Sequence, residues 1–360
     1  MRTLDEIYNK RIGNKYEEIV VSSLDSSGLE SMGNVVVFPQ NKEEIQDTVI
    51  FARKNKMNIV ARGNSTNFVG ASIPSGTKTI IMDFSKMNKV KDIDKDNMTI
   101  TLEPGIFLAN LNNVLKEDSI YFPIVPKSND IATIGGLVNM NSLSKRSLFY
   151  GPISNWIEEI KVIDGRAIDK SINRKDISSF VGSEGGCGLI YELKLKLTKL
   201  PNTTLDLFQF SNLDSLGNKL KELKRIKNIL SIEYIDKNTS YNIDLGKKFT
   251  LLVEYINFND EQEEHQGKTI NREEIDKINQ ISDNVIYSIL SEGNFIIEDV
   301  TANKDSLINV LKFFDLKGIP TYSTNIFSYV LHPVFRRRSA DYINELRKIL
   351  DSIKGEFIGE

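Results

Sequence analysis

The sequence predicts an α+β protein of two domains, and three observations support this class. Short β-rich runs alternate with amphipathic helical segments up to Pro201. Successive runs are separated by Lys, Asn and Asp, which is typical of antiparallel hairpins and not of a doubly wound sheet. After Pro201 the pattern changes, and 360 residues suffice for two domains. We expect an N-terminal extension at 1–30, a first domain at 31–201, a second at 202–330, and a C-terminal segment with a final helix at 331–360.

The first domain is expected to open with a strand, a helix and a second strand. "VVVF" (35–38) is a β-rich run ended by proline, and "NKEEIQDTVIFARKN" (41–55) follows it. The second stretch spaces its apolar residues near the helical period and has acidic residues in its first turn, which favours a capped amphipathic helix. "MNIVARG" (57–63) then returns to strand.

The rest of the first domain is predicted to be strands around one further helix. Strands are expected in "TKTIIMDFS" (77–85), "NKVKDID" (88–94) and "NMTITLEPG" (97–105), and a helix in "GIFLANLNNVLKE" (105–117). "LIYELKLKLTKLP" (189–201) alternates apolar and basic residues, which is the period of a half-buried strand.

The second domain is predicted to be an antiparallel sheet backed by helices. Helices are expected at 213–227, 272–290 and 338–354, and strands at 229–236, 248–257 and 294–301. The last helix carries its apolar residues on one stripe, so we expect it to dock on the rest of the protein.

Composition excludes several classes of protein. The chain has 46 basic and 49 acidic residues, so it lacks the basic excess of a nucleic-acid-binding protein. A single cysteine excludes an internal disulfide and an iron–sulfur cluster held by this chain alone. With only His265 and His332, an all-histidine metal site held without a partner is excluded as well.

The stretch "ARGNSTNFVGASIP" (61–74) is the first candidate ligand-binding segment. It follows a short apolar run, and hydroxyl and amide side chains stand between Gly63 and Gly70. Backbone N–H groups of such a loop can surround a phosphate. The stretch has neither the Gly-Lys-Ser/Thr ending of a triphosphate loop nor the three-glycine spacing of a dinucleotide-binding turn. The sequence alone therefore indicates a phosphate site without naming the ligand.

Two further glycine-containing segments follow. In "PKSNDIATIGGLVNMNS" (126–142), paired glycines precede a short helix-like run, which would let a ligand approach the backbone closely. "FVGSEGGCGLI" (180–190) has four glycines in seven residues before a long strand. Each segment alone is explained by an ordinary turn. Together, in this order, they are more specific.

These segments resemble the FAD-binding domain of the vanillyl-alcohol oxidase and p-cresol methylhydroxylase type. Within that family the chain is most similar to the D-lactate, glycolate and D-2-hydroxyglutarate dehydrogenase branch. The matching stretches are "VVVFPQNKEEI", "ARGNSTNFVGASIP", "TIGGLVNMN", "YGPISNWIEEIKVIDG" and "FVGSEGGCGLIYELKLKL", with "IEYID" and "LLVEY" resembling the cap. The resemblance implies a two-subdomain FAD-binding domain followed by an α+β cap domain with an antiparallel sheet.

The resemblance also implies which residues hold the cofactor. The expected FAD-binding residues are Arg62, Gly63, Asn64, Ser65, Thr66, Asn67, Gly70, Pro126, Ser128, Thr133, Gly135, Gly136, Asn141, Gly182, Glu184, Gly185, Gly188 and Ile190. Some members tether the flavin through histidine or cysteine in these loops. The first two segments contain neither residue, so we expect non-covalent FAD. Cys187 stands where the branch has leucine, which favours a packed apolar role over a reactive thiol.

The catalytic residues of the branch are matched only in part. The branch uses a His-x-Gly-Asp-Gly-Asn-x-His stretch, and "NIFSYVLHP" (325–333) stands in its place, with Asn325 for the first histidine. His332 and Glu360 survive as candidate catalytic residues, no metal site is expected, and Arg62 is a candidate clamp for a substrate carboxylate. Two alternatives stay open: His332 packs and hydrogen-bonds to backbone, and Arg62 pairs with a neighbouring acid.

The resemblance implies an FAD-dependent oxidoreductase that oxidises a D-2-hydroxy acid, D-lactate- or glycolate-like, by hydride transfer to flavin N5. The alternatives are a flavin-binding non-catalytic subunit of a glycolate-oxidase-like complex or a truncated inactive homologue, because the catalytic motif is degenerate and the sequence stops at Glu360. Expected partners are the substrate and a protein electron acceptor or companion subunit. No apolar run reaches the roughly 18 residues of a membrane span. We expect a cytoplasmic protein, peripheral to the membrane if its acceptor is a quinone.

Overall fold

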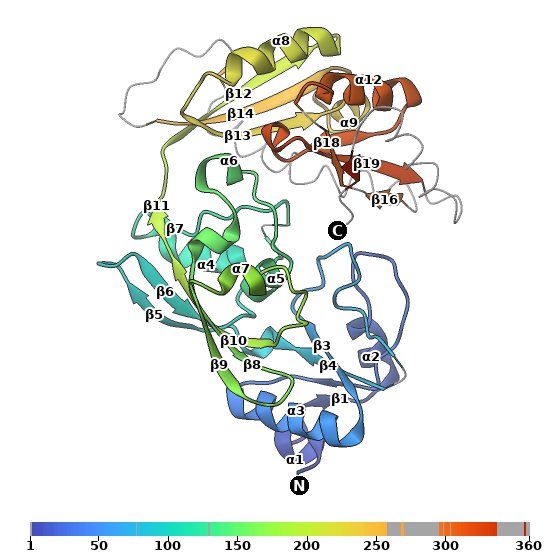
Figure 1. The fold of residues 1–360 in the computed structure, drawn as a ribbon, viewed down its shortest axis with the longest axis vertical. Helices are drawn as coiled ribbons and strands as arrows, with labels where there is room; N and C mark the ends of the chain where they lie inside the picture. The colour runs from blue at the N-terminus through green and yellow to red at the C-terminus, as the bar shows by residue number, and fades with distance from the viewer. Residues whose placement is uncertain are drawn as a thin grey trace. The chain divides into compact units, whose positions relative to one another are not determined.

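The computed structural model describes residues 2–76, 78–128, 130–257, 268–269, 295–297, 299–302, 304–336 and 356–357 (Figure 1). The chain divides into two units, one of residues 1–143 and 152–200 and the other of 144–151 and 201–360. Both units combine helices with sheets that contain antiparallel pairs, which confirms the predicted α+β class.

The first sheet of unit 1 has four strands in the order β1-β2-β4-β3. Strands β2 (Val35–Val37) and β3 (Asn58–Arg62) run parallel to β4 (Thr79–Asp83), and β1 (Ile12–Gly13) pairs antiparallel with β2. The predicted helix between β2 and β3 is α3 (Lys42–Asn55), which Asn41 caps by accepting the N–H of Glu44. Its buried apolar stripe lies in the same core as the strands. The β2-α3-β3 connection brings β3 to its end at Arg62, inside the first candidate segment.

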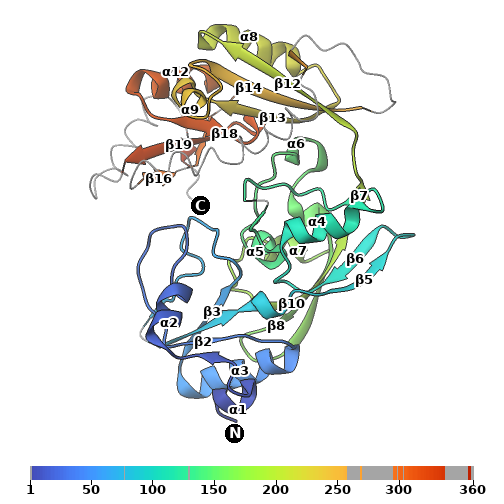
Figure 2. The ribbon, with the colours of Figure 1, turned by 180° about the vertical axis from the view of Figure 1, so that it is seen from behind.

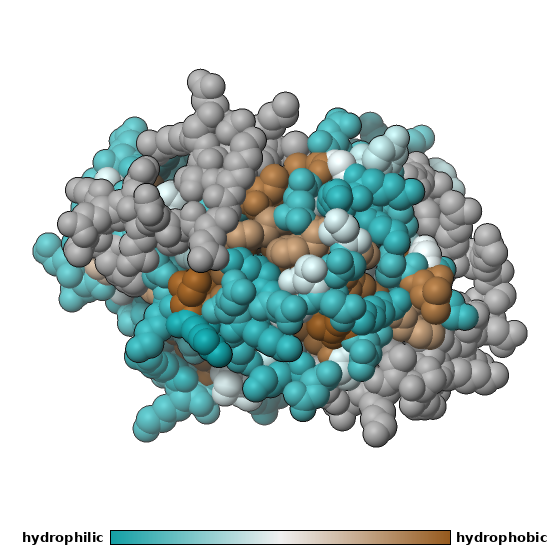
Figure 3. Space-filling model, turned by 90° about the horizontal axis from the view of Figure 1, so that it is seen from above, coloured by the Kyte–Doolittle hydropathy of each residue, from teal (hydrophilic) through white to brown (hydrophobic). Residues whose placement is uncertain are grey.

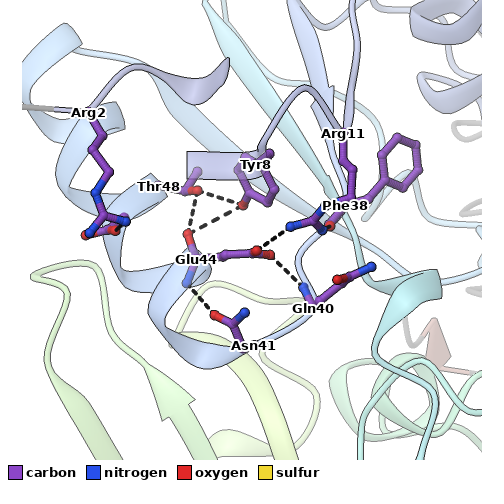
Figure 4. Close-up of polar contacts among 9 residues, drawn as sticks. Arg2, Tyr8, Arg11, Phe38, Gln40, Asn41, Glu44 and Thr48 are labelled. Carbon is purple, nitrogen blue, oxygen red and sulfur yellow. Dashed lines mark hydrogen bonds and ion pairs between the residues drawn. The ribbon is translucent and has the colours of Figure 1, made fainter. Parts of the chain in front are cut away.

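The N-terminal residues are built into unit 1 through Glu44 on α3. Helix α1 (Leu4–Tyr8) places the Tyr8 hydroxyl 2.7 Å from Oγ1 of Thr48, with the Tyr8 ring fully buried. Arg11 forms an ion pair with Glu44, whose other carboxylate oxygen accepts the N–H of Gln40 at 2.8 Å (Figure 4). These contacts fix the residues ahead of β2 on the face of α3.

The second sheet of unit 1 is antiparallel, in the order β5-β6-β10-β8-β9. Its strands are β5 (Val90–Asp94), β6 (Thr99–Leu102), β8 (Ile157–Ile163), β9 (Asp169–Asn173) and β10 (Leu189–Lys196). Helices α4 (Leu108–Lys116), α5 (Ile134–Asn139) and α7 (Ile177–Phe180) share one hydrophobic core with this sheet (Figure 2). The smaller elements of the unit are α2 (Tyr16–Ser22), η1 (Phe84–Lys86), β7 (Ile120–Tyr121), η2 (Ile153–Trp156) and β11 (Thr198–Lys199).

Unit 2 is built on a sheet in the order β15-β12-β14-β13-β18-β19-β17-β20, with β16 also paired to β19. Its strands are β12 (Thr203–Phe210), β13 (Ile229–Ile235), β14 (Phe249–Ile256), β15 (Lys268–Thr269), β16 (Phe295–Ile297), β17 (Val300–Thr301), β18 (Thr321–Ser323), β19 (Val330–Arg336) and β20 (Glu356–Phe357). Helices α8 (Leu213–Leu223) and α12 (Leu307–Lys317) lie together over one face of the sheet and share a core with it (Figure 1). Shorter helices are α6 (Ser147–Tyr150), α9 (Lys237–Asn242) and η3 (Ile326–Ser328).

The segment 144–151 belongs to unit 2 although both its flanks belong to unit 1. A buried ion pair fastens it to β14, with Nη2 of Arg146 at 2.7 Å from Oε1 of Glu254. Nζ of Lys145 lies 3.8 Å from Oε1 of Glu233 on β13. Both acidic partners come from neighbouring antiparallel strands, so the segment is held to the centre of the sheet.

Two predicted helices, at 272–290 and 338–354, lie outside the described residues. The structure adds strand β12, which lies between Pro201 and α8 and was not predicted from the sequence. Figure 3 shows the described surface from above, with hydrophobic side chains in separate patches among hydrophilic ones. Within the described part of the chain, no helix has the length and apolar character needed to cross a membrane.

Candidate functional site

The first and second glycine-containing segments touch each other in unit 1. A Cβ placed on Gly63 would lie only 2.3 Å from Oγ1 of Thr133, so only glycine fits beside this threonine without a shift. One residue further on, the Asn64 amide donates to the carbonyl of Ile131 at 3.0 Å. The loop after β3 is therefore packed directly on the segment that leads into α5.

The third segment completes the cluster. The N–H of Glu184 donates to the carbonyl of Asn139 at 3.0 Å, which ties the third segment to the end of α5. A Cβ on Gly182 would lie 3.2 Å from Cβ of Asn141, and one on Gly185 would lie 3.7 Å from Cβ of Ala61 on β3. All three segments that the sequence singled out thus meet at one place.

Local chemistry explains the second segment. Thr133 is the N-cap of α5 and accepts the N–H of Gly136 at 3.3 Å. The N–H of Gly135 donates to the carbonyl of Pro104 at 2.8 Å, and a Cβ there would come within 2.7 Å of the proline ring. Gly135 therefore allows a close approach between α5 and the chain after β6.

The third segment needs glycine for its backbone conformation. Gly182 and Gly185 have φ values of +80° and +83°, and Gly188 has +154°, all in the region that favours glycine. Glu184 adopts a φ of +52°, which is uncommon for a residue with a side chain. The series of positive φ angles turns the chain sharply into β10, whose first residues, with Ile190 among them, are in the core.

Two predicted ligands in the first loop are already engaged by the protein. Oδ1 of Asn67 accepts the N–H groups of Val69 and Ala71 at 3.2 and 3.0 Å, so this side chain shapes the loop. Nη1 of Arg62 donates to the carbonyls of Ser22 and Leu24 at 2.9 and 2.7 Å.

Arg62 also pairs with an acid, which is one of the alternatives left open by the sequence. Its Nε lies 3.4 Å from Oδ2 of Asp83 at the end of β4. Burial lowers the pKa of Arg62, and the nearby charges of Asp83 and Asp25 oppose that shift. With these contacts Arg62 joins β3 to β4 and to the segment after α2. Its role as a clamp for a substrate carboxylate stays a prediction.

Three buried polar atoms at the junction have no hydrogen-bond partner among the described residues. They are Oγ of Ser65, Oδ1 of Asn139 and Oγ of Ser183, one from each segment. A buried polar group without a partner costs about 1–3 kcal/mol, so a ligand that meets these atoms would recover that cost. Asn139 and Ser183 were absent from the predicted ligands, although both lie in the segments that the sequence identified.

The remaining predicted residues vary in environment. The carbonyl of Ser128 accepts the N–H of Ala132 at 2.8 Å and so turns the chain into the second segment, and Pro126 is buried. Cys187 is exposed, which contradicts the expectation of a packed apolar role. The physical reason is its place in a glycine-rich turn, where the chain reaches the buried strand β10 only at the following residues.

His332 is the one predicted catalytic residue of unit 2 that the structure describes. It lies on β19, is 7% exposed, and its Nδ1 pairs with the carboxylate of Asp299. Its ring stacks on Tyr322 of the neighbouring strand, with 4.8 Å between ring centroids. Nε2 of His332 is buried and has no hydrogen-bond partner in the described part of the chain. Among the described residues the histidine is therefore held by the side chain of Asp299, whereas one alternative left open by the sequence had it hydrogen-bonded to backbone.

The other catalytic predictions are placed differently. Asn325 is 4% exposed and accepts the N–H of Phe327, so it caps the short helix η3. Glu360 lies outside the described residues. Within the described ranges, no group of three or more His, Cys, Asp or Glu residues could hold a metal ion.

Comparison with known proteins concerns the part of the chain that holds the first two segments. A family model described as "FAD binding domain" matches residues 33–167, which include the first two segments. The prediction of FAD as cofactor, made from the three segments, is confirmed by this match.

Curated relatives come from the branch that the sequence resembles. The glycolate oxidase subunit GlcD of Bacillus subtilis (strain 168) is 29% identical over 221 residues, which cover 58% of this chain and 47% of that protein. A D-2-hydroxyglutarate dehydrogenase of Stutzerimonas stutzeri (strain A1501) is 25% identical, covering 47% of this chain and 38% of that protein. A D-lactate dehydrogenase of Archaeoglobus fulgidus is 26% identical, covering 59% and 49%. The matched region thus spans about half of each relative or less.

A solved structure shows the same fold over almost the whole chain. An alkyldihydroxyacetonephosphate synthase superposes with a TM-score of 0.74 at 16% identity, covering 96% of this chain and 79% of that one. At this identity the likeness concerns the fold alone.

The residues at the junction fit FAD. The first loop carries no lysine, and its backbone turns at Ser65 with a φ of +54° beside a buried hydroxyl that has no partner in the described chain. Backbone N–H groups and hydroxyls arranged in such a turn can hold a pyrophosphate. The orphaned atoms of Asn139 and Ser183 are then available for hydrogen-bonding groups of the same cofactor.

Proposed function

We propose that this protein oxidises a D-2-hydroxy acid. The premise is that the chain carries the FAD-binding domain found in the D-lactate, glycolate and D-2-hydroxyglutarate enzymes. The proposal rests on one observation above the others. Three segments far apart in the sequence meet in unit 1, and each contributes a buried polar atom without a partner among the described residues. The names of the curated relatives supply the substrate class.

Within this proposal FAD is held by unit 1 and supplies the acceptor for the hydride of the substrate. Gly63, Ser65 and Thr133 would hold its pyrophosphate, because these residues lie where the first loop meets the N-cap of α5. Asn139 and Ser183 would hydrogen-bond to the cofactor at the other side of the junction. The protein thereby orients the cofactor before the substrate arrives, which is the general contribution of a protein to cofactor chemistry.

His332 is the residue that we propose takes the proton of the substrate hydroxyl. The carboxylate of Asp299 faces Nδ1, which fixes the proton on that nitrogen and leaves the lone pair on Nε2. The stacked ring of Tyr322 limits rotation of the imidazole. A base held in this way retains one orientation between turnovers, which is what general-base catalysis requires.

The electrons are proposed to leave for a protein acceptor or a companion subunit. The relative named as a glycolate oxidase subunit is, by that name, part of a larger assembly.

An anaerobic bleaching experiment tests the function. The FAD-loaded protein is mixed without oxygen with D-lactate, glycolate or D-2-hydroxyglutarate, and with L-lactate as the control of opposite configuration. We expect loss of the oxidised-flavin absorbance with at least one of the first three and none with L-lactate. An unchanged spectrum with every substrate, in protein that carries FAD and is bleached by dithionite, would contradict the proposal and favour a non-catalytic flavin-binding subunit.

A further inference from the structure

We propose that Asp25, in the segment after α2, is a positioning residue for the FAD loop. Its Oδ2 accepts a hydrogen bond from Oγ of Ser72 at 3.1 Å, across 47 positions of sequence. Oγ of Ser72 in turn accepts from the amide of Asn67 at 2.9 Å, and Asn67 receives two backbone N–H groups of its own loop. The proposal rests on FAD binding by unit 1 and adds a residue that no motif identified.

The direction of every bond in this chain is determined. Oδ1 of Asn67 accepts from Val69 and Ala71, so its amide nitrogen must face Ser72. Since Ser72 already accepts that amide, its own proton goes to the carboxylate of Asp25. Only an acceptor at position 25 completes the chain. A carboxylate suits the role, because hydrogen bonds to ionised acceptors are stronger than neutral ones.

The backbone beside Asp25 holds the turn of the loop itself. The N–H of Ser26 donates to the carbonyl of Ser65 at 3.2 Å. Ser65 has a φ of +54° and carries one of the three buried polar atoms at the junction. The residue next to Asp25 thus holds the residue whose hydroxyl we assign to the cofactor.

Two further contacts tie the same segment to the loop. Arg62, at the start of the loop, donates to the carbonyls of Ser22 and Leu24. Gly70, with a φ of +79°, has Cδ1 of Leu29 at 2.6 Å from where a Cβ would stand. Residues 22–29 thus contact the loop at its beginning, middle and end.

Preorganisation is the physical reason for this arrangement. A loop that binds an anion through backbone N–H groups must hold them in one conformation, and fixing each residue only on binding costs affinity. With the clamp of Asp25, Ser72 and Asn67 in place, that cost is met on folding. Without it, FAD would still meet the same atoms but would bind more weakly and leave faster.

The test measures FAD affinity in the full-length protein stripped of flavin, by quenching of flavin fluorescence. In the wild type, Oδ1 of Asp25 accepts the N–H of Ser27 at 2.9 Å. Asp25→Asn keeps this acceptor oxygen but places an NH₂ group opposite the hydroxyl of Ser72, which then has no acceptor for its proton. Ser72→Ala removes the other partner. We expect about tenfold weaker FAD binding for each variant, which corresponds to about 1.4 kcal/mol. The double variant should lose little more than either single one, because the two residues act through one bond.

Asp94→Asn is the matched control. Asp94 also accepts a nearby backbone N–H, that of Asn97 three residues ahead at 2.9 Å, but it belongs to the β5–β6 hairpin. The affinity of the Asp94→Asn variant for FAD should equal that of the wild type. Circular dichroism of each flavin-free variant checks folding; if Asp25→Asn does not fold, Ser72→Ala decides alone.

The proposal is overturned if the single variants bind FAD within twofold of the wild type, if their effects multiply to about a hundredfold, or if Asp94→Asn weakens binding equally. These outcomes leave the cofactor assignment intact, since the wild type still binds FAD. A wild type that takes up no FAD overturns the cofactor assignment and this proposal with it.

Discussion

Gly63 and Thr133 lie in direct contact, so that a single added Cβ on the glycine would come within 2.3 Å of the threonine hydroxyl oxygen. The contact joins the loop after β3 to the N-cap of α5, two segments that 70 residues of sequence separate. Around it the third segment and the clamp of Asp25, Ser72 and Asn67 assemble.

Gly63→Ala should weaken FAD binding and destabilise unit 1. The new methyl group must displace Thr133, and overpacking of this kind typically costs about 1–3 kcal/mol. FAD affinity by fluorescence titration and the midpoint of urea unfolding both report the change. Gly165→Ala is the control, because a Cβ there meets nothing within 4 Å and Gly165 has no positive φ. Equal affinity in Gly63→Ala and wild type would contradict the contact.

Thr133→Val should lower the stability of the FAD-binding unit by about 1 kcal/mol, since it removes the oxygen that caps α5 while it keeps the shape of the side chain. Thr133→Ser keeps the cap and should stay near the wild type. Urea unfolding of flavin-free protein measures the cap alone, and the same experiment with FAD measures cap and cofactor together. If valine and serine behave alike, the hydroxyl has neither role.

His332→Gln should greatly slow bleaching by the substrate while FAD binding is unchanged. Loss of a general base costs about 10²- to 10⁴-fold in rate. Asp299→Asn should slow the reaction as well, because the amide no longer fixes the proton on Nδ1 of His332. Stopped-flow reduction of the flavin measures both. Unaltered reduction rates in His332→Gln would remove the histidine from the mechanism.

Unit 2 should lose stability in acid through Glu254. Burial raises the pKa of this carboxyl, but the charge and hydrogen bonds of Arg146, the charge of Lys145 and a hydrogen bond from Ser231 outweigh burial and leave the pKa below its ordinary value. The folded state therefore binds this proton more weakly than the unfolded state. Its stabilisation is complete above the ordinary glutamate value of about 4.3 and is lost as the pH falls through the lower folded value.

Glu254→Gln tests this pH dependence. At neutral pH the variant should be less stable by about 3–5 kcal/mol, because a buried guanidinium loses its carboxylate partner. Its stability should also change less than that of the wild type when the pH is lowered below about 4.3. Unfolding curves at several pH values measure both effects. Parallel pH profiles in variant and wild type would contradict the assignment to Glu254.

Sequence predicted those parts of the fold that local patterns encode. Helix α3 was visible in its apolar spacing, and β10 in its alternation. Strand β12 was not predicted, because only Leu205 and Asp206 of its residues are buried and the pattern does not alternate between buried and exposed positions. Residues 144–151 belong to unit 2 because they form ion pairs with Glu233 and Glu254. These partners lie about 90–110 residues further along the chain, so no local pattern predicts the pairing.

The candidate site also has a part that local sequence patterns predict and a part that they do not. The three segments could be located without a structure, because the glycines that sharp turns require are visible in the sequence. No local sequence pattern distinguishes Asn139, Ser183 and Asp25 from other polar residues. Their importance appears only when burial, the absence of a described partner, or a contact with a distant residue is known. Cys187 was placed wrongly because the exposure of a turn depends on where the flanking strand begins.

Titration of the flavin-free protein with FAD, followed by acid precipitation, tests the central claim most directly. The account predicts uptake of one FAD per chain with quenching of flavin fluorescence, and recovery of all the flavin in the supernatant, as expected for a non-covalent cofactor. A protein that stays colourless at saturating FAD, or flavin that remains in the precipitate, would contradict it.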